Sequence, residues 1–202
     1  MNNKFLTRGL TVSAVAIAGY AFAMVFAVDL SNNIAVGNHF HARPIALYAH
    51  LFFGALALLI GPFQFSEKLR NSRKTLHRWM GRSYVVFCLS SGVAGFFMAL
   101  SSTTIDARTG FAVLAVAWIY TTVQAYRKAR ARDFAAHKDW MIRSFALTCA
   151  AITLRVLLPV QLIAGVPFET TYIIISWACW VPNLMLAEWL VRRKPAISAA
   201  SA

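Results

Sequence analysis

Six apolar stretches, each close to the length of a membrane-spanning helix, dominate this sequence. About 20 apolar residues in a helix cross the roughly 30 Å hydrocarbon core of a bilayer. Because backbone groups inside lipid must find their partners within the protein, we expect each stretch to be helical. The expected spans are residues 6–28, 44–63, 83–100, 110–126, 144–164 and 171–190.

The composition excludes an ordinary soluble domain. Hydrophobic residues make up 59% of the 202 residues and charged residues only 13%, whereas soluble domains average about 45–50% and about 25%. The three cysteines lie inside apolar runs without metal-binding spacing, so we expect them to be buried packing residues. We interpret residues 1–202 as one all-α domain, an integral membrane six-helix bundle.

The first apolar stretch has two interpretations. Lys4 and Arg8 precede an apolar run with a small-x-small site at Ala21–Ala23, as in a cleaved signal peptide. The run is longer than the usual apolar core of a signal peptide and continues beyond that site. We therefore expect an uncleaved first span, with a cleaved signal peptide as the alternative.

The basic residues predict how the spans are oriented. Of the 20 Lys and Arg residues, seventeen flank the expected spans on one side, whereas Arg43 and Arg108 lie on the other and Arg155 lies within a span. Positively charged loops remain in the cytoplasm, so we expect both termini to be cytoplasmic, in a bacterial inner membrane. The net charge of +13 then reflects topology and contact with anionic lipids, rather than binding of nucleic acid.

An internal duplication relates the middle four spans. Gln64 lies thirteen residues before His77, and Gln124 lies thirteen before His137. Similar residues follow each histidine, HRWMGRSY in the first copy and HKDWMIRSF in the second. Each copy is a hairpin of two spans joined by a basic loop, and the two hairpins predict a pseudo-two-fold four-helix core. His77 and His137 become equivalent residues at the cytoplasmic ends of two spans, where they can face each other.

A facing pair of histidines on opposed helices is the ligand set of a bis-histidine haem. We assign haem b to this site, with His77 and His137 as iron ligands. Arginines suit the anionic propionates, and tryptophans can pack beside the ring, which adds Arg78, Arg82, Arg143, Trp79 and Trp140. Two alternatives stay open: another metal, or histidines that only fix the loops, with the tryptophans as interface anchors.

A second candidate site lies nearer the outside. At 1.5 Å per residue, His50 lies about 9 Å into the second span and Arg155 about 14 Å into the fifth. Ionisable residues within a membrane usually face the bundle interior and indicate a functional site. We assign His50 and Arg155 to a substrate or quinone. The acceptors open to Arg155 are a ligand carboxylate, a quinone carbonyl, a haem propionate or a backbone carbonyl freed by Pro159, with snorkelling as the alternative.

The remaining titratable residues give simpler expectations. His39 and His41 lie in an outer loop, where we expect them to be solvated, with metal binding as the alternative. Glu188 is spaced to pair with Arg192 at i,i+4. The sequence contains no phosphate loop, nucleophile elbow or paired His-Glu zinc motif. No Asp or Glu lies in the middle of a span, which weighs against a proton-coupled pump.

These residues resemble a family of predicted bacterial membrane proteins of unknown function. The similarity covers about residues 44–160 and rests on His50 and on three segments: GPFQF at 61–65, LHRWMGRSY at 76–84 and HKDWMIRS at 137–144. The family implies no established activity.

The layout is also similar to that of transmembrane b-type cytochromes that pass electrons from ascorbate to ferric iron. Those proteins have six spans, a four-helix core and histidines that bind two haems. The resemblance implies ligand roles for His77 and His137 only, because Gly110 stands where a histidine would match His50. The implied function is electron transfer between quinone or a partner and an acceptor. The alternative is a cofactor-free protein: an accessory subunit of a membrane complex, a homodimer or a small-molecule permease.

Overall fold

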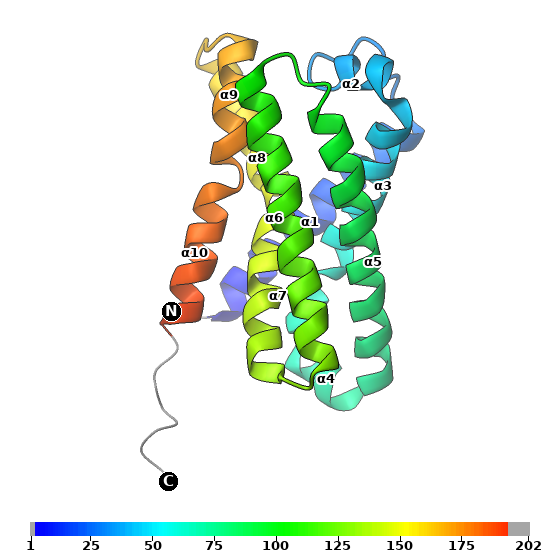
Figure 1. Ribbon diagram of the computed structural model, residues 1–202, viewed down its shortest axis with the longest axis vertical. Coiled ribbons are helices and arrows are strands. Elements are labelled where there is room, and N and C mark those ends of the chain that lie inside the picture. The colour runs from blue at the N-terminus through cyan, green and yellow to red at the C-terminus, as the bar shows by residue number, and fades with distance from the viewer. Residues whose placement is uncertain (1–2, 194–202) are drawn as a thin grey trace.

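The computed structural model describes residues 3–193, with side chains from residue 8 onward, and the regular secondary structure of this part of the chain is all helical. Figure 1 shows long helices running alternately up and down, joined by short turns. Lys4 and Lys194, two of the basic residues that predict the orientation, lie outside the described side chains. The helices are α1 Asn3–Phe26, α2 Gly37–Ala42, α3 Pro44–Ile60, η1 Pro62–Phe65, α4 Glu67–Ser72, α5 Lys74–Ala99, α6 Ile105–Arg130, α7 Phe134–Thr148, α8 Ala150–Ile163, α9 Phe168–Ala178 and α10 Val181–Arg192.

Five helical segments of the described chain are long and apolar enough to cross a membrane, and they overlap five of the six expected spans. They are Arg8–Phe26, Pro44–Phe65, Lys74–Ala99, Phe134–Ile163 and Phe168–Arg192. The remaining expected span, 110–126, lies in α6, which is as long as α5 at 26 residues but is not among the five. Polar residues within α6 and charged residues at both its ends lower its hydropathy, so the count of six spans stays a prediction.

The helices extend beyond the apolar stretches at their polar ends. We expected a span to begin at residue 83, but α5 begins at Lys74 and includes the basic residues before it. Hydrogen-bonding caps start several helices: Ser66 accepts from Leu69 N, Thr104 from Ala107 N and Asp133 from Ala136 N. The apolar stretch therefore marks the part of each helix that suits lipid, whereas caps mark where the helix begins.

The helix of the second expected span is interrupted near its end, at the point where it packs against α7. Helix α3 ends at Ile60, and the 3-10 turn η1 begins at Pro62, where the sequence contains Gly61-Pro62. Gly61 lies against α7, since a Cβ atom there would overlap the ring of Phe145. The same ring packs on Phe65 at 5.5 Å between centroids. The glycine thus permits the close packing of the second span on α7.

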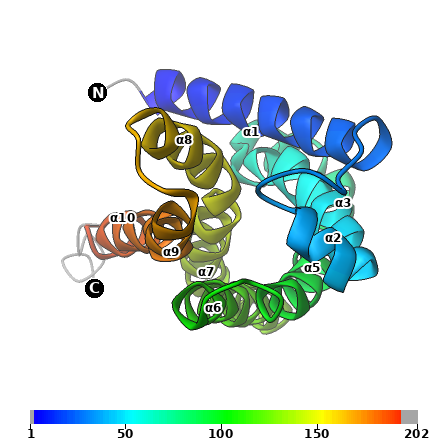
Figure 2. The same cartoon turned by 90° about the horizontal axis from the view of Figure 1, so that it is seen from above.

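Seen from above, the helices are arranged in a ring (Figure 2). Helices α3, α5, α6 and α7 follow one another around the bundle, each packed on the next. Helix α1 lies obliquely across α3 on one side, and α9 packs on α6 on another. Large apolar side chains such as Val86, Phe97 and Trp189 are exposed on the outside, as expected of a protein in contact with a lipid bilayer.

A buried hydroxyl network joins three helices in the interior. The hydroxyl of Tyr84 on α5 lies 3.1 Å from Ser144 Oγ and 2.8 Å from Thr148 Oγ1 on α7. Two residues of α6 complete it: Thr122 Oγ1 lies 2.7 Å from Ser144 Oγ, and Trp118 Nε1 donates to Thr148 Oγ1 at 3.0 Å. Satisfied buried polar groups of this kind fix the relative positions of helices.

Candidate functional site

A cavity of about 170 Å³ lies inside the half of the bundle that contains α2. Small residues make much of its wall, among them Gly54, Gly92, Gly95, Ala55 and Ala115. Polar or ionisable residues also line it, among them His39, His50, Ser102, Thr148, Arg155 and Tyr172. The two residues assigned from the sequence to a substrate or quinone, His50 and Arg155, therefore share one cavity, although their helices are far apart in the chain.

His50 is held in a defined tautomer. Its Nδ1 lies 3.0 Å from the carbonyl oxygen of Ser91, which only accepts, so Nδ1 carries the proton. Ser91 Oγ donates to the carbonyl of His50 at 2.9 Å and thereby ties the same two helices together. Gly95 leaves room for the ring, since a Cβ atom there would lie 2.8 Å from Nδ1. The other nitrogen, Nε2, is left as an acceptor that makes no hydrogen bond within the described residues.

Arg155 is only partly satisfied by the protein. Its Nη1 donates to the carbonyl of Ala151 at 3.1 Å, and its guanidinium lies 5.7 Å from the ring centroid of Tyr20. A backbone carbonyl is thus one of its acceptors, but the buried Nε has no hydrogen-bond partner. No ion pair involves Arg155 among the described residues. A buried cation without a counter-charge is costly, which marks this side chain as a ligand-binding candidate.

The expectation of a solvated His39 is wrong. His39 is only 3% exposed, because α2 folds over the cavity and brings the imidazole between Ser101 and Tyr172. Ser101 Oγ donates to the carbonyl of Met98, so it accepts from His39 Nδ1 at 2.8 Å, and Tyr172 donates to Nε2 at 2.9 Å. We call this arrangement of His39, Ser101 and Tyr172 the clasp. His41 is exposed, as expected of a loop histidine.

The clasp predicts sensitivity to acid. Burial, with a smaller contribution from the charge of His50, lowers the pKa of His39 to about 4 from 6.5. Between these values the unfolded chain binds the proton and the folded chain does not, so stability present at neutral pH is lost as the pH falls from 6.5 towards 4. We expect a loss of about 2 to 3 kcal/mol over this interval, measured by chemical unfolding in detergent.

A matched pair of variants checks the assignment. His39→Gln is expected to flatten the pH dependence, whereas His41→Gln, at an exposed position two residues away, leaves it unchanged. Equal slopes in the wild type and His39→Gln would show that another group is responsible.

His77 and His137 occupy corresponding places on α5 and α7, two helices that both run upward in Figure 1. Each histidine lies seven residues before a member of the Tyr84–Ser144 hydrogen bond. Seven residues are two helical turns, so each histidine lies on the side of its helix that carries this hydrogen bond. His137 Nδ1 donates to the carbonyl of Ala125 at 2.8 Å, whereas the buried Nδ1 of His77 has no partner.

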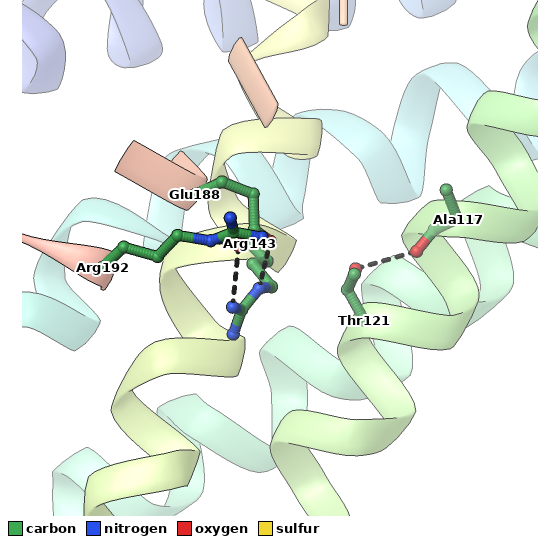
Figure 3. A network of polar contacts seen from close by, with 5 residues as sticks. All are labelled: Ala117, Thr121, Arg143, Glu188 and Arg192. Atoms are coloured by element: carbon green, nitrogen blue, oxygen red, sulfur yellow. Dashed lines mark hydrogen bonds and ion pairs between the residues drawn. The ribbon is translucent and has the colours of Figure 1, made fainter. Parts of the chain in front are cut away.

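The arginines assigned to haem propionates differ in their surroundings. Arg143 makes two hydrogen bonds to Glu188 on α10, of 2.6 Å from Nε and 3.0 Å from Nη2, as Figure 3 shows. Arg192 lies 3.6 Å from the same carboxylate, which confirms the i,i+4 pair expected from the sequence. Arg143 is thus occupied within the protein.

Three of the other residues assigned to the haem are exposed, and the fourth, Trp140, is half-buried. Arg78 and Arg82 are exposed, and the guanidinium of Arg82 lies 5.4 Å from the ring centroid of Trp79, which is itself exposed. Trp140 packs against Tyr120 and lies under Arg143, at 4.7 Å from its guanidinium. Within the described residues no three His, Cys, Asp or Glu side chains gather as metal ligands do.

Sequence reasoning missed Tyr172 and Ser101. A tyrosine near the end of an apolar stretch resembles an interface anchor, and no local pattern links it to a histidine 133 residues earlier. Only a prediction of which loop covers which end of the bundle would have found the clasp.

Comparisons with curated proteins and with solved structures find no match. A family model described as "Predicted membrane protein (DUF2306)" matches residues 47–191. The matched range includes His50, Arg155, His77 and His137 but not His39 of the clasp. The match confirms the resemblance to a membrane protein family of unknown function. The chain belongs to this family of predicted membrane proteins.

Proposed function

We propose that this protein is a redox protein of the bacterial inner membrane that holds one haem b between His77 and His137. It crosses the membrane six times with both termini in the cytoplasm, and its basic loops contact anionic lipids there. It carries electrons between quinone or a partner and an acceptor. The observation that supports this function best is the shared position of the two histidines, two turns before the Tyr84–Ser144 hydrogen bond.

Each of the two imidazoles keeps a nitrogen that could bind the iron of a haem. The Ala125 carbonyl holds the Nδ1 proton of His137, which leaves the Nε2 lone pair for iron, the usual arrangement of a ligating histidine. His77 has a buried nitrogen without a hydrogen-bond partner, and such orphaned groups are rare unless a ligand uses them. A bound haem would supply one-electron exchange at its iron. The chain contributes the two positioned ligands and the apolar helix faces that exclude water.

The ion pairs reduce the three arginines that the sequence suggests as propionate partners to two. Arg143 is held by Glu188, and its transfer to a propionate would leave that carboxylate with only the exposed Arg192. Arg78 and Arg82 lie within one and two turns of His77 and have no acidic partner among the described residues. We therefore propose these two as the propionate ligands, with Trp79 and Trp140 beside the ring.

The visible spectrum of the purified protein tests this function. With haem supplied during expression, we expect a Soret band and a sharp α-band after reduction by dithionite, at about one haem per chain. His77→Ala and His137→Ala are each expected to abolish the bands, because both axial ligands are needed. The control is His41→Ala, which removes an exposed histidine. Unchanged haem content in both ligand variants, or a flat spectrum of the wild type in haem-rich cells, would refute the proposal.

A cofactor-free binding protein or permease is the second candidate function. Arg155 favours it, because this residue lines a cavity and its buried Nε has no hydrogen-bond partner among the described residues. A third candidate function is that of an accessory subunit or a homodimer. The exposed apolar residues Met185, Leu186 and Trp189 of α10 support it. A flat spectrum together with saturable binding of a small molecule at the cavity would favour the permease over haem.

A further inference from the structure

The cavity is lined by a hydrogen-bond donor and an acceptor with unused capacity. The donor is the guanidinium of Arg155, of which only Nη1 makes a hydrogen bond within the described residues, and a guanidinium stays protonated in proteins. The acceptor is His50 Nε2, because the proton of this imidazole is held on Nδ1 by the Ser91 carbonyl. Both residues line the same cavity. A molecule that satisfies both must therefore carry one group that accepts and one that donates, as two phenolic oxygens on one ring do.

The size and wall of the cavity limit the rest of the molecule. Its volume is about 170 Å³, and an apolar cavity of about 150 Å³ holds one benzene ring. Gly54, Gly92, Ala55 and Ala115 make a wall without polar side-chain atoms. Trp118 adds an aromatic face, with its Nε1 already donating to Thr148. The body of the ligand is therefore a single apolar ring.

The polar groups argue against the simplest competing ligand, a carboxylate. A carboxylate only accepts hydrogen bonds, so it would satisfy Arg155 but place its oxygens against the lone pair of His50 Nε2. Among the hydroxyls of the lining residues, that of Tyr172 donates to His39 within the clasp and that of Thr148 donates to the carbonyl of Ser144. The hydroxyl of Ser102 is buried without a hydrogen-bond partner among the described residues. A neutral ring with two oxygens meets both demands without a second charge.

We infer that this cavity binds a hydroquinone, one hydroxyl donating to His50 Nε2 and the other oxygen accepting from the guanidinium of Arg155. The inference goes beyond the haem site and does not rest on it, since His77 and His137 do not line this cavity. It narrows the sequence-based assignment of a substrate or quinone to the reduced, hydroxyl-bearing form of the ring.

The test is calorimetric titration of the full-length, haem-free chain in detergent, with 1,4-hydroquinone as the probe and empty micelles as the blank. We expect saturable binding at about one molecule per chain. Its dimethyl ether, 1,4-dimethoxybenzene, keeps the ring and the acceptors but lacks the donor, so we expect binding at least about 10-fold weaker, as for one lost hydrogen bond. Benzoate tests the carboxylate. Tighter binding of benzoate than of hydroquinone would overturn the inference in favour of an anion site.

Variants locate the site within the molecule. Arg155→Leu and His50→Phe are each expected to weaken hydroquinone binding about 10- to 100-fold, because each removes one hydrogen bond, one of them to a charged group. The matched controls are Arg43→Leu and His41→Phe, which change exposed residues. Equal affinity in all four variants, or no saturable binding by the wild type, would overturn the inference. Hydroquinone binding is measured by calorimetry on the haem-free chain, and haem binding is measured by the visible spectrum. A failure of the hydroquinone inference is therefore distinguishable from a failure of the haem proposal.

Discussion

Replacement of Gly110 by leucine is expected to destabilise the bundle by about 3 kcal/mol. Gly110 is buried where α6 meets α9, and a Cβ atom there would lie 2.8 Å from Ser176 Cβ and 3.0 Å from the Ser176 carbonyl oxygen. A clash with backbone is not relieved by a side-chain rotation, so the two helices must move apart. The measurement is the midpoint of denaturant-induced unfolding in detergent.

The control for this substitution is Gly19→Leu. Gly19 is an exposed helical glycine of α1, and a Cβ atom at this position would have no neighbouring atom within 4 Å. We expect that variant to match the wild type or exceed it, since glycine disfavours helix. If Gly110→Leu unfolds at the same midpoint as Gly19→Leu, α6 and α9 are not in close contact.

Glu188→Gln is expected to lower the free energy of unfolding by about 2 to 3 kcal/mol, which is close to the lower end of the loss for a broken buried ion pair. The substitution keeps the shape of the side chain but leaves the Arg143 guanidinium, which is only 17% exposed, without a counter-charge. Arg192 is 81% exposed and contributes little to the pair. The double variant Arg143→Met/Glu188→Leu is expected to recover most of the loss, because it removes the stranded charge.

The chain contains a matched exposed pair for comparison. Arg70 and Glu67 lie 3.6 Å apart with side chains 45% and 78% exposed, and such pairs contribute about 0–1 kcal/mol. Glu67→Gln should therefore leave the unfolding midpoint nearly unchanged. A Glu188→Gln variant as stable as Glu67→Gln would mean that solvent already screens Arg143.

Features set by local sequence could be predicted. The apolar stretches located the helices, and the i,i+4 spacing located the Glu188–Arg192 contact. Counting residues from the ends of two spans placed His50 and Arg155 at similar depth, and both line one cavity. Each of these results follows from the rise per residue of a helix, which needs no knowledge of tertiary packing.

Features set by distant contacts could not be predicted. Arg143 was assigned to a propionate because its partner, Glu188, lies 45 residues away on a helix whose rotation the sequence does not specify. His39 was expected in solvent because its loop is polar, but α2 folds back over the bundle. The facing of His77 and His137 stays a prediction whose support is the Tyr84–Ser144 hydrogen bond between their helices.

The clasp also constrains the order in which the protein is assembled. His39 and Tyr172 are 133 residues apart, so α2 leaves the ribosome long before α9 is synthesised. Until α9 enters the bilayer, the imidazole lacks one partner and the mouth of the cavity lacks one of its walls. Closure of the cavity is therefore a late event of biogenesis, and a nascent chain that stalls before Phe168 leaves the lining of the cavity open to water and to quality-control proteases.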